Sequence, residues 1–332
     1  MPRDVHQTLR RLLAGRTPDA KSLVVTVFGD AVVPHGSLVW IGSLIRWLAP
    51  FGINERAVRT ALYRLCREGW FTNRSIGRRS DYGLTPLGRH NFADAERRIY
   101  AAEPPPWTGE WSLVLLGQQD VPGEKRDRAR RSLRWHGFGE LAPSVLLHPA
   151  GGMDEVRLVL SDLGLERKAI VLRARSESLL PAEGQALRNL AAAAWDLGDL
   201  TTAYRDYCHR FRPLSEDLAS AALPVPEVCF SIRVLAIHEY RRVLLRDPEL
   251  PLELLPEDWV GTEARRLCRA IYRRVHARAA EHVRATGRTS EGPLPPPAAF
   301  SSRRFTARHR AGGDQSPRKR GSRFSRNART PS

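Results

Sequence analysis

Residues 51–83 read FGINERAVRTALYRLCREGWFTNRSIGRRSDYG and decide the fold, because their spacing predicts a basic helix followed by a basic hairpin. Asn54 is a favourable N-cap residue, since its side-chain oxygen can accept a hydrogen bond from a free amide of the first helical turn. Residues 55–68 have helical periodicity, and Gly69 is a typical helix stop. The residues that follow alternate loosely and turn at 76–80, which predicts two short strands.

The predicted helix has one apolar and one basic face. At about 100° per residue, Val58, Ala61, Leu62 and Leu65 gather on one side and are expected to pack. The residues that we expect to face DNA are Asn54, Arg56, Arg59, Thr60, Tyr63, Arg64 and Arg67, with Arg78 and Arg79 at the hairpin tip.

Residues 41–90 hold nine Arg/Lys and three acids, a net charge of +6. A merely solvated helix face, which is the alternative, more often mixes both signs in i,i+4 pairs. An apolar stripe at 41–48 and a turn at 50–52 precede the basic helix. Helix, turn, helix and hairpin is the order of a winged helix-turn-helix domain.

This stretch also carries a family resemblance. SLVVTVFGDAVVPHG (22–36), VWIGSLIRWLAPFGINERAVRTALYRL (39–65) and GRRSDYGLTPLGR (77–89) resemble the PaaX family, bacterial repressors of phenylacetic acid catabolism genes. The resemblance continues through EWSLVLL (110–116) and IHEYRRVLLRDPELPLELLPEDWVG (237–261). It implies that residues 24–28 are helical, although their valines favour a strand.

Composition sets wide limits. The chain has 332 residues, is 42% hydrophobic and carries a formal charge of +17, which favours polyanionic partners and nucleic acid first. Its four cysteines are far apart, which is typical of a reducing compartment and argues against structural zinc. No apolar run is long enough to span a membrane, and the N-terminus lacks a signal core. We therefore expect a cytoplasmic protein that does not bind membranes.

We expect an α+β protein with three folded units. The expected parts are a winged helix-turn-helix domain at 20–90, a helix and Pro-rich linker at 91–106, a central domain at 107–180, a helical regulatory domain at 183–285 and a disordered basic tail at 289–332. The tail holds ten Arg/Lys and two acids and has little to bury. The tail either adds sequence-independent affinity for DNA or is a solvated segment without a role in binding.

The central unit has a pattern of strand, helix and further strands. The predicted strands are 111–116, 144–147, 156–160 and 169–173, with a charged helix at 124–136. This favours a ferredoxin-like sandwich, and the resemblance implies a domain like the Cas2 nuclease subunit of CRISPR systems. Asp120 follows the first strand, near where such nucleases carry a metal-binding aspartate, but a loop aspartate before Val-Pro-Gly is ordinarily turn chemistry.

The third unit carries the candidate ligand-binding residues Arg241, Arg242 and Arg246. They either bind the phosphates of an acyl-CoA or pair with nearby acids to fix helix packing. The sequence contains no P-loop, nucleophile elbow or zinc-binding His motif, so we expect no catalytic residue, metal or cofactor.

We therefore predict a repressor that is not an enzyme and binds double-stranded DNA as a homodimer on a roughly palindromic operator. The resemblance implies an aromatic-acid (phenylacetate-type) operon and phenylacetyl-CoA, or another aryl-CoA, as the effector. Two alternatives stay open. One is a protein that coats DNA without sequence preference, and the other is a metal-dependent nuclease that acts through the central domain.

Overall fold

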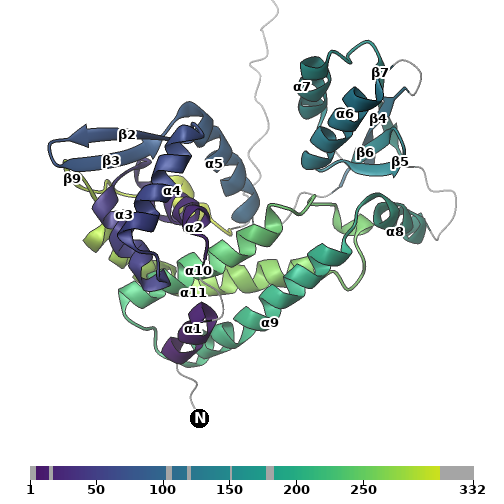
Figure 1. Ribbon diagram of the computed structural model, residues 1–332. Helices are drawn as coiled ribbons and strands as arrows, with labels where there is room; N and C mark the ends of the chain where they lie inside the picture. The colour runs from purple at the N-terminus through teal and green to yellow at the C-terminus, as the bar shows by residue number, and fades with distance from the viewer. Residues whose placement is uncertain are drawn as a thin grey trace, which may run out of the picture.

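The computed structural model describes residues 5–14, 18–101, 107–117, 121–149, 152–176 and 183–306. These residues form a three-stranded sheet, a four-stranded sheet, a two-stranded ribbon and a group of long helices (Figure 1). The mixed α+β class expected from the sequence is therefore confirmed.

The N-terminal helix–hairpin unit spans residues 20–84. Its elements are α2 (Ala20–Val27), a π-helical turn (Phe28–Val32), a 3-10 turn (Val33–His35), β1 (Leu38–Trp40), α3 (Ile41–Leu48), a 3-10 turn (Ala49–Phe51), α4 (Glu55–Arg67), β2 (Phe71–Ile76) and β3 (Arg79–Leu84). β3 is the middle strand and pairs antiparallel with β1 and β2. α5 (Pro86–Ile99) follows. The predicted order of helix, turn, helix and hairpin is confirmed.

α2 is helical, as the resemblance implied, although its valines favour a strand. The Asp19 carboxylate accepts a hydrogen bond from the Ser22 amide at 2.8 Å and so caps the helix. Leu23, Val24 and Val27 are fully buried, and the helix packs against α4. Burial of this face outweighs the weak strand propensity of the segment.

The central domain has the ferredoxin-like order βαββαβ. Its elements are β4 (Glu110–Leu116), α6 (Gly123–Trp135), β5 (Gly139–Ala142), β6 (Val145–Pro149), α7 (Met153–Leu163) and β7 (Ala169–Arg175). The sheet order is β5-β6-β4-β7 with antiparallel neighbours. α6 and α7 cover one face of the sheet (Figure 1).

One prediction within this domain is wrong. Residues 156–160 were expected to form a strand but belong to helix α7. Val156, Val159, Leu160 and Leu163 are buried at i, i+3, i+4 and i+7 spacing, which is a helical stripe. Gly164 closes the helix with φ +64°, a conformation that suits glycine. Residues 156–160 are too few to distinguish the two-residue side-chain period of a strand from the helical period of about 3.6 residues.

The C-terminal unit is helical, as predicted. Its elements are α8 (Glu183–Ala194), α9 (Gly198–Ser220), α10 (Pro226–Leu244), a 3-10 turn (Leu252–Leu254) and α11 (Val260–Thr286). α10 is buried over most of its length between α9, α11 and the N-terminal unit. α1 (Val5–Ala14) lies against α9, where the Thr8 hydroxyl donates to Asp217 at 2.7 Å.

The N-terminal unit and the C-terminal helices share one hydrophobic core, whereas the central domain has a core of its own. Trp47 of α3, for example, packs against Phe230 of α10 with ring centroids 5.6 Å apart. α3, which packs against α4, therefore rests directly on the C-terminal helices.

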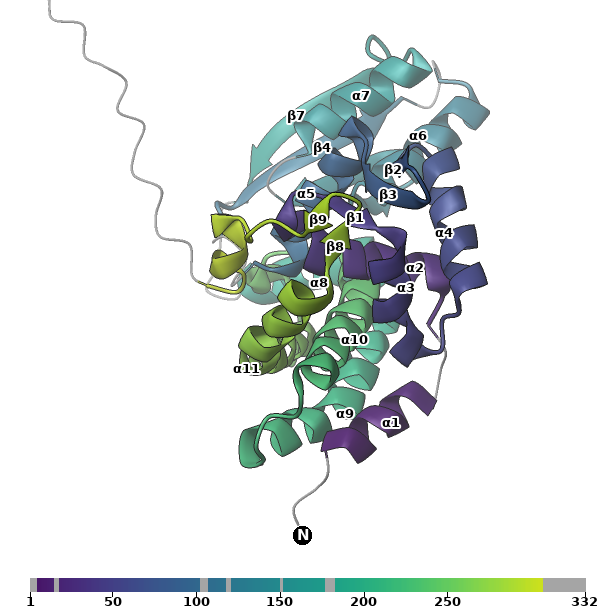
Figure 2. The ribbon, with the colours of Figure 1, turned by 90° about the vertical axis from the view of Figure 1, so that its left-hand side faces the viewer.

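Residues 289–306 were expected to be disordered, and this expectation is wrong. With Arg288 they form the C-terminal strap, residues 288–306, which contains β8 (Arg288–Thr289), β9 (Gly292–Pro293) and a 3-10 turn (Ala299–Arg303). Figure 2 shows β8 and β9 beside β1. Phe305 is 0% exposed and packs on Tyr100 and Tyr272, which explains why the segment folds back. Residues 307–332 of the predicted tail lie outside the described residues.

Candidate nucleic-acid interface

α4 begins as the sequence predicts. The Asn54 side chain accepts a hydrogen bond from the Ala57 amide at 2.9 Å, so it acts as the N-cap. Gly52, with φ +76°, allows the tight turn between α3 and α4. The predicted apolar stripe is buried, as shown by Val58, Leu62 and Leu65 at 0% exposure. The opposite face of α4 therefore points away from the core.

That opposite face is exposed and basic. Its exposed residues are Arg56, Arg59, Thr60, Tyr63, Arg64 and Arg67. Tyr63 is 63% exposed, which is unusual for a large aromatic side chain in a folded domain. The geometry thus brings these predicted DNA-binding side chains of the helix to one surface.

Ion pairs with acidic side chains neutralise only part of the positive charge on this face of α4. Arg59 is held by Glu55 at 2.7 Å, while the other acid of the segment, Glu68, pairs with Lys21 on α2 at 2.6 Å. Among the residues that the structure describes, Arg56, Arg64 and Arg67 have no ion-pair partner. Three guanidinium groups on one helix face are thus free to meet an anion.

The two arginines that were predicted at the tip of the β2–β3 hairpin, Arg78 and Arg79, have different surroundings. Gly77, with φ +58°, and Arg78 form the turn, and Arg78 is exposed there. The Arg79 guanidinium lies over the Trp40 ring, 5.2 Å from its centroid. Arg78 is therefore the arginine at the tip, and Arg79 also braces the hairpin against β1.

A buried polar node beneath the N-terminal unit was not predicted. The Asp30 carboxylate, fully buried, accepts hydrogen bonds from Arg233 of α10 at 2.7 Å and from Tyr100 at 2.9 Å. Arg304 of the strap lies 3.2 Å from Asp30 and forms two 2.7 Å hydrogen bonds with Glu96 of α5. The node joins the π-helical turn after α2 to α5, α10 and the strap.

Charge balance explains why the node is stable. Two arginines face two carboxylates there, so no buried charge is left without an opposite one. Burial raises the pKa of Tyr100, which keeps the proton that its hydroxyl donates to Asp30. The signal in the sequence was a single acid inside the apolar run VFGDAVV, since such an acid needs buried partners.

Arg241, Arg242 and Arg246 do not form one cluster. Arg241 donates to Thr26 Oγ1 at 2.9 Å and to the Ser22 carbonyl at 3.2 Å, so it fixes α10 against α2. Arg242 is exposed, 3.5 Å from Glu239, and the exposed Arg246 donates to the Arg242 carbonyl. This arrangement favours the helix-packing alternative for Arg241.

His238 adds a second contact between α10 and α2. Its Nδ1 lies 2.9 Å from Thr26 Oγ1. Burial, together with the neighbouring charges of Arg241 and Arg242, lowers the pKa of His238 to about 3. The imidazole is therefore neutral at physiological pH.

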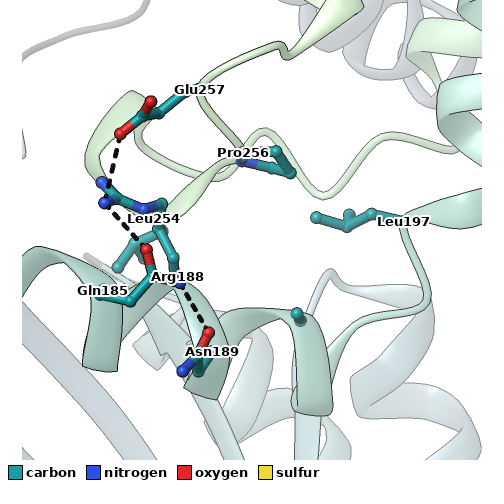
Figure 3. Close-up of a pocket in the computed structure, with 8 residues that line it drawn as sticks. Gln185, Arg188, Asn189, Leu197, Leu254, Pro256 and Glu257 are labelled. Carbon is teal, nitrogen blue, oxygen red and sulfur yellow. Dashed lines mark hydrogen bonds and ion pairs between the residues drawn. The ribbon is translucent and has the colours of Figure 1, made fainter.

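A pocket of about 340 Å³ lies between α8 and the segment around Leu254 and Pro256 (Figure 3). Its wall is partly apolar and partly polar, and Arg188 crosses it to Glu257 at 3.5 Å. The lining residues are Gln185, Arg188, Asn189, Ala192, Leu197, Leu254, Pro256 and Glu257. Its size and mixed lining suit part of a small organic ligand.

Within the described residues, no group of three or more His, Cys, Asp or Glu side chains could hold a metal ion. Asp120, the predicted metal candidate, lies outside those residues. In the same part of the chain, no helix has the length and apolar character needed to cross a membrane.

Comparison with known proteins decides the family. Family models match residues 19–88 (PaaX-like protein), 104–186 (PaaX protein central Cas2-like domain) and 195–285 (PaaX-like protein C-terminal domain). The chain belongs to the PaaX family. The predicted resemblance, including the Cas2-like central domain, is confirmed. α4 and the hairpin lie in the first matched region, and the pocket lies at the junction of the other two.

One curated relative of this PaaX-family chain is the transcriptional repressor PaaX of Escherichia coli (strain K12). The two are 40% identical over 285 residues, which cover 86% of this chain and 89% of the repressor. A solved structure, the uncharacterized protein Rv0674 from Mycobacterium tuberculosis, is 28% identical with a TM-score of 0.46 and covers 76% of this chain and 96% of that one.

Proposed function

We propose that this PaaX-family chain is a transcriptional repressor, and that its helix–hairpin unit is a winged helix-turn-helix bound to double-stranded DNA. The observation that carries the proposal is the exposed face of α4, with three arginines that have no ion-pair partner among the described residues beside a 63% exposed Tyr63. The name of the E. coli relative, a transcriptional repressor, supports the same function.

α4 would enter the major groove. Arg56, Thr60, Tyr63 and Arg67 would face base edges, where arginine can pair with both acceptors of guanine. The residues that would contact the backbone and set register are Asn54, Arg59, Arg64, Arg78 and Arg79. Arg78, at the hairpin tip, has the freest reach toward a phosphate or a minor groove.

The repressor would act as a homodimer. A two-fold axis places two α4 helices on half-sites one helical turn apart, or a multiple of it, so the operator would be roughly palindromic. The controlled operon would be one for aromatic-acid catabolism of the phenylacetate type, as the family name suggests.

Release from DNA would follow binding of phenylacetyl-CoA or a related aryl-CoA. An effector can shift the equilibrium only by its preference for the conformation that does not bind DNA, typically about 1–3 kcal/mol. The contacts of α10 with α2, through Thr26, His238 and Arg241, offer a route from the C-terminal helices to α4.

The pocket beside α8 is a candidate site for the acyl part of this effector. An Ala192→Trp variant would fill it, since Ala192 lines the pocket. We expect unchanged operator affinity and loss of release by phenylacetyl-CoA, measured by fluorescence anisotropy of a labelled operator. The double variant Arg242→Ala with Arg246→Ala tests the other candidate ligand-binding residues in the same assay. Full release from Ala192→Trp would exclude this pocket.

Selection of bound duplexes from a random library tests the function itself, because no operator needs to be known beforehand. The proposal predicts enrichment of one palindromic motif, and competition against random DNA should then show a preference of at least about 10³-fold. A library that stays unenriched would favour the DNA-coating alternative. Cleavage of the duplexes when magnesium is added would favour a nuclease.

A further inference from the structure

Helix α6 concentrates positive charge in a central domain that is otherwise acidic. Residues 123–135 contain six Arg/Lys and two acids, whereas the rest of residues 107–180 contains five Arg/Lys and eight acids. A helix that only needed solubility would more often mix both signs. None of the roles proposed above uses this charge.

Some of these cations have structural partners and some do not. Arg130 pairs with Asp127 at 3.1 Å and with Glu140 at 2.7 Å, and Lys125 donates to the Leu163 carbonyl at 2.9 Å. Three exposed arginines of α6 have no ion-pair partner in the described part of the chain, namely Arg128, Arg131 and Arg134.

Trp135 lies on the same side of the helix. At 100° per residue it falls within about 60° of Arg128 and Arg131, opposite the buried Ala129 and Leu133. It is 87% exposed, although tryptophan is highly buried on average in folded proteins. The α6 surface, defined as Arg128, Arg131, Arg134 and Trp135, therefore combines unpaired cations with an uncovered aromatic ring.

Helix α6 and the proposed recognition helix α4 lie on the same side of the molecule. α4 and α6 both lie toward the viewer in Figure 1, and both lie at the right-hand side of Figure 2 after the rotation. A long duplex bound to α4 would therefore run on the side of the molecule that also carries α6.

We infer that the α6 surface is a second DNA-binding surface, which holds the sugar-phosphate backbone of the duplex beside the site read by α4. This inference rests on the proposed DNA-binding function. Arg128 to Arg134 spans about 9 Å of helix axis, and B-DNA presents one phosphate charge per ~1.7 Å of its own axis, so several phosphates fall within reach. Such contacts fix position and add affinity without reading sequence.

The test compares two operator duplexes at several salt concentrations, one limited to the selected motif and one with about two helical turns (~20 bp) of flanking DNA on each side. The variant carries Arg128→Ala, Arg131→Ala and Arg134→Ala. A control variant carries Arg157→Ala, Arg205→Ala and Arg278→Ala, which removes the same charge from exposed arginines outside α6. Circular dichroism verifies that both variants fold.

On the long duplex, the variant should lower the slope of log affinity against log salt by about 2.7 for each protomer of the bound dimer relative to the control, since each phosphate contact contributes roughly 0.9. A fourfold rise in salt should then cost the wild-type protein roughly 40-fold more affinity than the variant for each protomer whose α6 surface contacts DNA. On the short duplex the two slopes should coincide. Trp135→Ala should weaken binding to the long duplex by severalfold without changing the slope, because it removes no charge.

Identical slopes for variant and control on the long duplex would overturn the inference while leaving the role of α4 intact. Failure of the wild-type protein to bind any duplex would instead overturn the proposed function, and this inference with it. Unchanged DNA binding together with a lost response to phenylacetyl-CoA would assign the α6 surface to the effector's phosphates, and would equally overturn it.

Discussion

Removal of Arg304 should destabilise the N-terminal unit strongly, although this residue lies in a segment with the composition of a disordered tail. The Arg304 side chain is 2% exposed and binds Asp30, Glu96 and the Gly29 carbonyl. Its guanidinium carbon also lies 4.0 Å from the centroid of the Tyr100 ring. Arg304→Ala leaves Glu96 without its partner and Asp30 with only one of its two arginines.

Breaking a buried ion pair by removing one partner typically costs about 3–5 kcal/mol of unfolding free energy, and we expect a loss in that range. Arg304→Lys should recover part of it, because a lysine keeps the charge but not the planar set of donors. The assay is urea unfolding followed by circular dichroism, with Arg157→Ala, an exposed arginine, as a control expected to change stability by less than about 0.5 kcal/mol.

Truncations separate the strap from the rest of the tail. A chain that ends at Thr306 keeps every strap contact described above and should be as stable as the full chain. A chain that ends at Gly287 loses Arg304 and the buried Phe305, so it should lose at least as much stability as Arg304→Ala. Equal stability of both truncations would refute the reasoning, because the strap would then contribute nothing.

Three further predictions concern the core, pH and the tail. Leu65→Ala, at a fully buried position of α4, should lower the unfolding free energy by about 2–5 kcal/mol in the same urea assay. Because burial lowers the pKa of His238 to about 3 from an ordinary value near 6.5, the unfolded chain binds a proton between these values that the folded chain does not, and stability should fall as pH falls through this window. His238→Gln should flatten that dependence by up to about 1.4 kcal/mol per pH unit in urea unfolding between pH 4 and 6, and an unchanged slope would contradict the assignment. Residues 307–332 hold eight Arg/Lys and one acid. Their deletion should lower the affinities for operator and random DNA together and flatten both salt slopes. A change in the ratio of the two affinities would mean that the tail reads sequence.

The elements with strong local signals were predictable from the sequence. α4 has an N-cap at Asn54, a buried stripe at helical spacing and a glycine stop, and each of these features acts within one or two turns of chain. The hairpin has Gly77 at its turn, where φ is positive. The exposed basic face of α4 was predictable from the buried stripe, because the residues on the opposite side of a surface helix face solvent.

The features that escaped prediction depend on contacts between distant residues. Arg304 and Asp30 are 274 positions apart, and only their meeting gives either of them a reason to be buried. The strap has no periodicity, and its composition matches that of disordered tails. The sequence leaves Arg241 a candidate phosphate ligand, because no local signal indicates that Thr26 lies beside it.

The most direct test of the central claim is the affinity of Arg56→Ala and Arg67→Ala for the selected operator, measured by fluorescence anisotropy beside Arg157→Ala. Arg56 and Arg67 are exposed on α4 without an ion-pair partner among the described residues, so both variants should fold normally. Each should lose about 1–3 kcal/mol of operator affinity and relax the preference at one position of each half-site. Wild-type affinity in both variants would contradict the claim that α4 reads the operator.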